Sequence, residues 1–166
     1  ANVTSIKGVI TEKTQELDKL TQNYHRSKSR LESLVNITER YDGYGNSIRK
    51  IMELKDSNPG ILGVIADIIK VEKQYETAIE TALGGTIQNI VTDKENTAKE
   101  LINYLKVNKL GRATFLPLNA IHSRNTLEND NCINENGVVG VASNLVRVSF
   151  EYEGLAKYLL GRILVV

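Results

Sequence analysis

The sequence predicts a mixed α/β protein in which a long coiled-coil helix precedes two similar α/β subdomains, the second of them incomplete. Three observations support this fold class. Apolar residues recur at heptad spacing through residues 1–41. A stretch of the chain recurs 77 residues further on. After residue 42, short apolar runs alternate with segments of helical periodicity, which is typical of helices packed on strands.

The N-terminal segment, residues 1–41, has the pattern of a coiled-coil arm. With Val3 at position a, the a and d positions are apolar except for Lys13, Ser27 and Thr38, and the spacing does not slip. Such a stripe suits a helix that pairs along one seam, and the alternative is a long helix packed on its own domain. No complementary heptad segment follows, so we expect the partner to be a separate chain or a segment outside this sequence. The seam residues are Ile6, Ile10, Leu17, Leu20, Tyr24, Leu31 and Leu34.

The internal repeat predicts two similar structural units packed together. Residues 63–71 match residues 140–148 without a gap, Tyr75 then falls on Tyr152, and Leu83 falls on Leu160. A match at a fixed offset indicates a repeated supersecondary unit. The first unit continues for about 50 residues after its Leu-Gly pair, whereas the second has only five left. We therefore expect the second unit to be cut short and its partner surface to be missing.

The first unit is expected to contain three helices and three strands after a break at residues 42–45. Apolar spacing predicts a short helix around Ile48, Ile51 and Met52, and a helix over residues 75–83 closed by glycines. Strands are predicted at 61–65, 87–91 and 113–116, the last of them stopped by a proline. Thr92 and Glu95 have capping-box spacing, which predicts a further helix with a buried stripe. That stripe is Ala98, Leu101, Ile102 and Leu105.

The second unit is expected to follow a polar loop rich in Asn, Asp, Glu and Ser at residues 123–137. A helix over 152–160 repeats the apolar spacing of residues 75–83, and residues 163–166 predict a strand that breaks off. The domain organisation is therefore an arm (1–41), a first subdomain (42–122), a linker loop (123–139) and the start of a second subdomain (140–166).

The sequence provides no catalytic, cofactor-binding or metal-binding set. His25 lies on the arm, and neither His122 nor Cys132 has an evident partner in the sequence. The sequence contains no phosphate-binding or zinc-binding motif. No apolar run is long enough to span a membrane. A single cysteine cannot form an internal disulfide, which fits a reducing compartment. A formal net charge of +1 predicts no strong overall field. One local basic group stands out, either as a solvated face or as a contact for DNA phosphates. Its members are Lys99, Lys106, Lys109 and Arg112.

Residues 110–119, Leu-Gly-Arg-Ala-Thr-Phe-Leu-Pro-Leu-Asn, closely resemble the most recognisable stretch of the hinge domain of bacterial SMC (structural maintenance of chromosomes) proteins. Further similar stretches occur in the family's order between residues 59 and 161, and the heptads take the place of the family's N-terminal arm. These stretches are residues 59–64, 75–80, 82–85, 88–91, 140–146 and 158–161.

This resemblance implies two pseudo-symmetric subdomains between antiparallel coiled-coil arms. It also implies a homodimer formed by pairing of sheet edges. ATP would be bound at distant head domains, and the hinge itself would carry out no enzymatic reaction. The implied function is that of the dimerisation hinge of a chromosome-condensing ATPase. The implied location is the cytoplasm, at the nucleoid, with no membrane contact. DNA is implied as a further binding partner. The candidate dimer edge is Arg112, Ala113, Thr114 and Phe115. The alternatives are a sequence-independent DNA-binding domain and a ligand-binding or enzymatic α/β domain.

Overall fold

A computed structural model describes residues 2–40, 44–122, 126–127 and 131–166. Its backbone contacts divide the chain into two units, residues 1–43 and residues 44–166. Residues 42–43 of the predicted break and part of the polar loop lie outside the described residues. The two units are described separately below.

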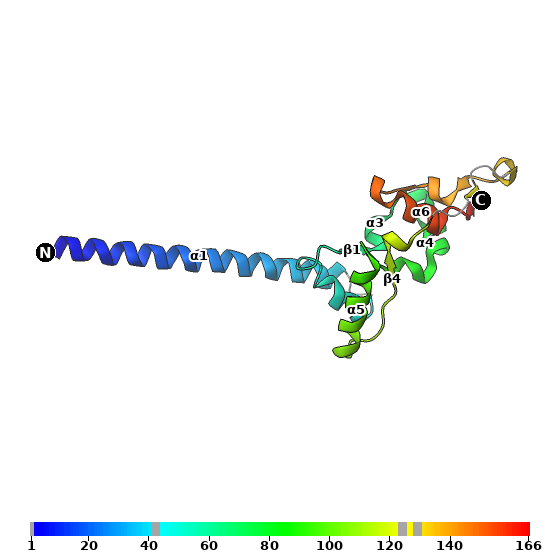
Figure 1. Ribbon diagram of the computed structural model, residues 1–166. Helices are drawn as coiled ribbons and strands as arrows, with labels where there is room; N and C mark the ends of the chain where they lie inside the picture. The colour runs from blue at the N-terminus through cyan, green and yellow to red at the C-terminus, as the bar shows by residue number, and fades with distance from the viewer. Residues whose placement is uncertain (1, 41–43, 123–125, 128–130) are drawn as a thin grey trace. The chain divides into compact units, whose positions relative to one another are not determined.

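The N-terminal unit is one uninterrupted helix, α1 (Asn2–Arg40), drawn in blue in Figure 1. It contains no proline, and its single glycine, Gly8, has open space around its Cα atom, so nothing in the segment interrupts the helical hydrogen bonds. The long helix expected from the heptads is confirmed.

The second unit begins with α2 (Asn46–Met52), which starts directly after Gly45. Ile48, Ile51 and Met52 are buried, as their spacing predicted. The chain then enters a three-stranded sheet in the order β1 (Ile61–Val64), β3 (Ile90–Thr92) and β4 (Phe115–Pro117). β1 is antiparallel to β3, whereas β3 and β4 are parallel. Parallel neighbours need a crossover, and α5 (Glu95–Val107) provides it.

The repeat is visible as two successions of equivalent elements. In the first copy, α3 (Ile65–Ile68) and β2 (Lys70–Val71) lead into α4 (Glu76–Leu83). In the second, β5 (Gly140–Val141), a 3-10 turn at 142–144 and β6 (Val146–Arg147) lead into α6 (Glu153–Leu160), and β7 (Leu164–Val165) follows. α4 and α6 are 77 residues apart at both ends. The mixed α/β fold with a pseudo-repeat is therefore confirmed.

The equivalent glycines of the two copies both lie in paired strands and have similar backbone angles. Gly63 pairs with Val91 at a β-bulge in the first copy, and Gly140 pairs with Val165 in the second. Both glycines have backbone angles that favour glycine, with φ of +147° and +154°. The match between the copies therefore extends to local backbone conformation.

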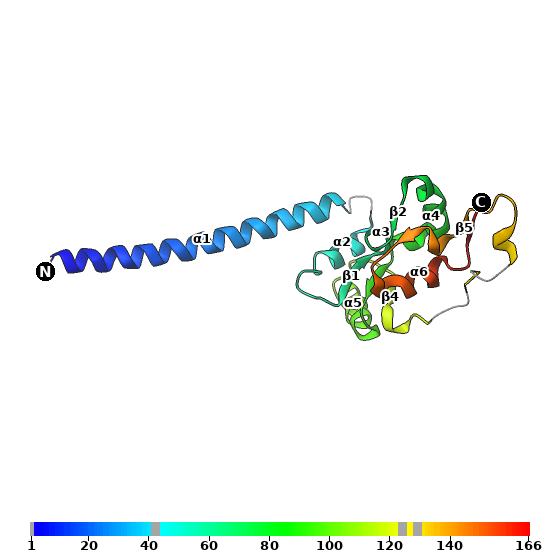
Figure 2. The same cartoon turned by 90° about the horizontal axis from the view of Figure 1, so that it is seen from above.

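The copies pack on each other around a pair of short strands. β2 and β6 pair antiparallel, with Lys70 opposite Arg147 and Val71 opposite Val146, and Arg147 forms an ion pair with Glu72. The green first copy and the orange to red second copy lie side by side in both views (Figures 1 and 2). One apolar core joins them, which is consistent with two units that stabilise each other. Its buried members are Ile65, Ile69, Ile79, Leu83, Val91, Ala142, Leu155, Leu160 and Val165.

Several local predictions were wrong. Residues 84–88 form a 3-10 helix because Gly84 turns the backbone at φ +49°, so β3 starts only at Ile90. Thr92 does not cap α5, since it is buried in β3, and Lys94 occupies the N-cap position. Ile102 is exposed because only the other face of α5 packs on the sheet.

β4 begins later than expected and includes the proline that was predicted to end it. Residues 111–114 precede the strand, and Gly111 lies there with φ +98°. Pro117 is accommodated because β4 is an edge strand of the three-stranded sheet and pairs only with β3 there.

Candidate interaction surfaces

The predicted seam of α1 is exposed along the described part of the helix. Ile6, Leu17 and Tyr24 keep 58%, 62% and 62% of their surface open to solvent. Ile10, Leu20 and Leu31 are exposed to a similar degree, and Leu34 is half-buried. A row of exposed large apolar side chains at heptad spacing is typical of a helix that pairs with another helix.

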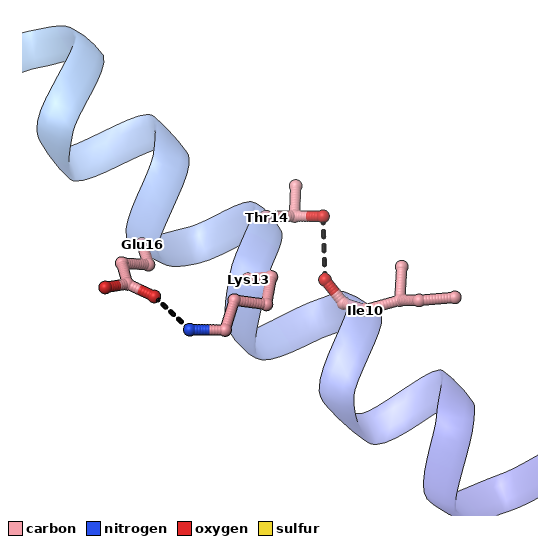
Figure 3. A network of polar contacts seen from close by, with 4 residues as sticks. All are labelled: Ile10, Lys13, Thr14 and Glu16. Carbon is pink, nitrogen blue, oxygen red and sulfur yellow. Dashed lines mark hydrogen bonds and ion pairs between the residues drawn. The ribbon is translucent and has the colours of Figure 1, made fainter.

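Lys13 occupies a d position of this seam and forms an ion pair with a residue of its own helix. Its Nζ lies 2.7 Å from Glu16 Oε2, as Figure 3 shows. On the adjacent turn, the Thr14 hydroxyl donates a hydrogen bond to the carbonyl of Ile10 at 2.8 Å. The cation at the seam therefore already has an intrahelical counter-charge.

β4 forms an outer strand of the three-stranded sheet. The carbonyl of Thr114 accepts a hydrogen bond of 2.9 Å from the N–H of Ile90 in β3. Successive peptide groups in a strand point to alternate sides, so the N–H and C=O of Phe115 point away from β3. Of the candidate edge residues, only Phe115 belongs to β4, while Arg112, Ala113 and Thr114 lie in the loop before it.

The basic residues occupy α5 and the loop that follows it. Lys99 lies on the helix at 3.8 Å from Glu95. Lys106, Lys109 and Arg112 are exposed and form no ion pair with another described residue. The three free cations therefore lie within seven residues of chain at the end of the helix.

The loop holds Lys109 in an unusual backbone conformation. Its φ is +53°, the left-handed region, and Lys109 is the one described non-glycine residue with positive φ. The N–H of Leu110 donates to the carbonyl of Leu105 at 3.0 Å, which closes the helix end in the manner of a Schellman motif. Glycine is the usual residue at this position because a side chain there costs free energy.

Ser47 anchors the far side of the same loop. Its side chain, only 7% exposed, donates a hydrogen bond of 2.6 Å to the carbonyl of Arg112. Ser47 was not predicted from the sequence, where its one available signal is a small polar residue directly before the apolar spacing of α2. Ser47 thus fixes the path of the backbone between the basic loop and β4.

Two titratable side chains, Asp93 and Tyr152, have pKa values that their surroundings shift from the ordinary ones. The Thr97 hydroxyl donates to Asp93 at 2.6 Å and lowers the pKa of that carboxyl, and the N–H of Lys94 contributes in the same direction. Burial raises the pKa of Tyr152, and the charge of Glu151 adds to the shift. Both arrangements lie at helix starts.

Among the described residues, no three His, Cys, Asp or Glu side chains gather as a metal site would require. His25 and His122 are exposed, and Cys132 is half-buried. Within the same part of the chain, every helix is too short or too polar to cross a bilayer.

Comparison with known proteins identifies similar sequences and folds. Residues 58–166 match the family model described as the flexible hinge domain of SMC proteins. The chromosome partition protein Smc of Desulfitobacterium hafniense is 37% identical over 156 residues, which cover 92% of this chain and 13% of that protein. The Bacillus subtilis protein of the same name is 36% identical over 146 residues, covering 87% and 12%. The chain thus spans about an eighth of these relatives.

Two solved structures are similar over most of the chain. One is an asymmetric dimer of the Geobacillus stearothermophilus SMC hinge domain, with a TM-score of 0.71 and 39% identity, covering 89% of this chain and 60% of that one. The other is the Pyrococcus furiosus Smc hinge domain with an extended coiled coil, with a TM-score of 0.57 and 32% identity, covering 93% and 54%.

Proposed function

The chain belongs to the family of SMC flexible hinge domains, and on this premise we propose that it is part of the hinge through which two copies of a chromosome partition protein dimerise. The observation that carries the proposal is the combination of an exposed heptad seam on α1 with a pseudo-repeated α/β unit. A hinge that joins two arms needs both parts. The relative crystallised as a dimer supports the same role.

We propose that the arm pairs with an antiparallel helix that returns from the second subdomain. The relative described with an extended coiled coil supports this arrangement. Burial of the seam gives the pairing its free energy, since each fully buried Leu or Ile side chain contributes about 1.5–3 kcal/mol. Lys13 needs no counter-charge from the partner because Glu16 supplies one.

The outer edge of β4 is the proposed dimer contact of the first subdomain. Phe115 offers a backbone donor and acceptor on the side away from β3, which is the arrangement required for strand addition. Phe115→Pro would remove the outward N–H and leave the hydrogen bonds to β3 in place. In the protein extended to the hinge length of its relatives, we expect this variant to shift the molar mass from two chains towards one, with an unchanged circular dichroism spectrum.

Leu116→Pro is the matched control for that experiment. By the same alternation, the N–H of Leu116 points towards β3, so its loss should lower the stability of the sheet itself. If Phe115→Pro leaves the dimer intact in light scattering while it remains folded, β4 is not the contact.

Sequence-independent DNA contact is a second proposed role, favoured by the three unpaired cations Lys106, Lys109 and Arg112. Lys109 occupies a left-handed position where glycine would cost less free energy, so backbone stability does not account for a lysine there. Each phosphate contact makes the slope of log affinity against log salt concentration more negative by about 0.9. A fluorescence titration of a short duplex at several salt concentrations would therefore count the contacts.

The proposed activity of the whole protein lies outside this segment. We propose that ATP is bound and hydrolysed by other domains of the parent protein, and that this chain acts only through non-covalent contacts. The parent protein is then placed in the cytoplasm, at the nucleoid. Mutation of the hinge edge should alter chromosome partition while the ATP affinity of the head domains stays the same.

A further inference from the structure

Each repeat carries a groove at the equivalent position. Groove I, about 270 Å³ in volume, lies between β2 and α4, and groove II, about 400 Å³, lies between β6 and α6. Seven of the residues that line groove II lie 77 positions after residues that line groove I. The two grooves are therefore one structural feature of the repeat, present twice.

The residues that differ between the grooves change both size and charge. Ile79 in groove I corresponds to Ala156 in groove II, and the smaller side chain is consistent with the larger volume. Glu80 corresponds to Lys157, whereas Glu76 is matched by Glu153. The strands add one cation to each groove, Lys70 to groove I and Arg147 to groove II. The formal charge of the lining side chains is therefore −1 in groove I and +1 in groove II.

Groove I combines an apolar floor with an acidic rim. Its floor includes Ile69 and Ile79, which are 5% and 1% exposed. Glu76 and Glu80 lie one helical turn apart on α4, are exposed, and form no ion pair with another described residue. Two like charges at this spacing repel each other, so a cation between them is stabilised.

The strand side of groove I offers backbone groups as well. β2 pairs with β6 on one side only, and Lys70 and Val71 line the groove. An extended segment can add to such an edge through main-chain hydrogen bonds and place alternate side chains in a pocket. The volume of 270 Å³ lies below the usual range for small-molecule sites, about 300–1,000 Å³, and suits one or two side chains.

We propose that groove I is a docking site for an extended peptide segment of a partner protein, in which an apolar side chain lies beside a lysine or arginine. The apolar side chain packs on the floor, and the cation lies between Glu76 and Glu80. This site is independent of the proposed hinge contact, because it lies on β2 and α4 and not at β4.

The test is a titration of the ¹⁵N-labelled chain, followed by amide chemical shifts, with the blocked tripeptide Leu-Lys-Val as the probe. For so small a ligand we expect a dissociation constant on the order of 1 mM. The amides of Val71 and Ile79 should shift. Their counterparts in groove II, Val148 and Ala156, should stay in place and serve as an internal control.

Charge variants separate the proposal from non-specific binding. Glu80→Lys copies the charge of groove II and should weaken binding of the probe by about threefold to tenfold, the range of one or two surface charge pairs. Glu153→Gln, in groove II, should change nothing. A probe with glutamate in place of lysine should bind groove I less tightly by a similar factor.

Three results would overturn the proposal. The first is the absence of shifts in groove I at probe concentrations about tenfold above the expected constant. The second is equal binding of the acidic and basic probes. The third is a change in the molar mass of the dimeric hinge on Glu80→Lys, because groove I would then be occupied by a second copy of the chain. The dimer test at Phe115 has a different readout, so either proposal can fail alone.

Discussion

Lys109 provides a test in which stability and DNA binding respond to different properties of one residue. It has left-handed backbone angles with φ +53° at the end of α5, and its charge belongs to the proposed DNA contact. Lys109→Gly and Lys109→Gln both remove the charge. They differ in the backbone, since only glycine adopts this conformation without a steric cost.

The expected difference between the two variants follows from that cost. A side chain in the left-handed region costs about 1–2 kcal/mol, and the greater freedom of glycine in the unfolded chain offsets about 0.5–1 kcal/mol. The Gly variant should therefore exceed the Gln variant by about 0.5–1 kcal/mol in free energy of unfolding. For a unit of this size the difference corresponds to a melting temperature higher by roughly 2–5 °C.

Thermal melts and DNA titrations of both variants complete the test. Both should lose the same DNA affinity, and the salt slope should become less steep by about 0.9 in each, because one phosphate contact is lost. Equal melting temperatures would refute the argument from backbone conformation. Unchanged DNA affinity in both would remove Lys109 from the proposed contact.

Three further predictions concern the fold that positions these surfaces. Gly63→Ala and Gly140→Ala should each lower the free energy of unfolding by about 1–3 kcal/mol in urea titrations, because both sites have φ angles that favour glycine; a cost at only one site would contradict the repeat. The folded-state pKa of Asp93 lies below its ordinary 3.8, so its stabilisation is complete above that pH and is lost as the pH falls through the lowered value. Melting temperatures below about pH 4 should therefore depend less on pH in Asp93→Asn, and an unchanged acid limb would contradict this role. Ser47→Ala should cost about 1–2 kcal/mol in chemical denaturation, since the carbonyl of Arg112 loses its donor; no measurable loss would show that the loop does not depend on this bond.

The features that were predictable from the sequence depend on local periodicity. In the heptads of α1 and in α4 and α6, apolar residues recur every three or four residues. This spacing matches the turn of an α-helix, so it predicts the helices directly. The match between Gly63 and Gly140 was likewise visible as a repeat before its backbone reason was known.

The features that were missed depend on contacts between distant residues. Asn119 provides the acceptor for the N–H of Glu95 from 24 positions away, which replaces the expected capping box. Ser47 reaches Arg112 across 65 positions. Strands as short as β2 and β6 exist because each pairs with the other copy, and no local pattern indicates such a partner.

The candidate surfaces were predictable to different degrees. The exposed seam follows directly from the heptads, and the basic residues were identified by their clustering. The edge at Phe115 was anticipated only through the family resemblance. Its strand begins later than the apolar run suggested because Gly111 and the Ser47 bond shape the loop before it. The grooves became visible only once the two copies could be compared in three dimensions.

The molar mass in solution distinguishes a dimerisation hinge from a domain that stays a single chain. Light scattering over a micromolar concentration range would compare this chain with one that continues through the remaining hinge sequence of its relatives and a returning helix. We expect a stable mass of two chains for the longer protein and a mass below that of two chains for the shorter one. A longer protein that remains a single chain throughout that range would contradict the proposed dimerisation hinge.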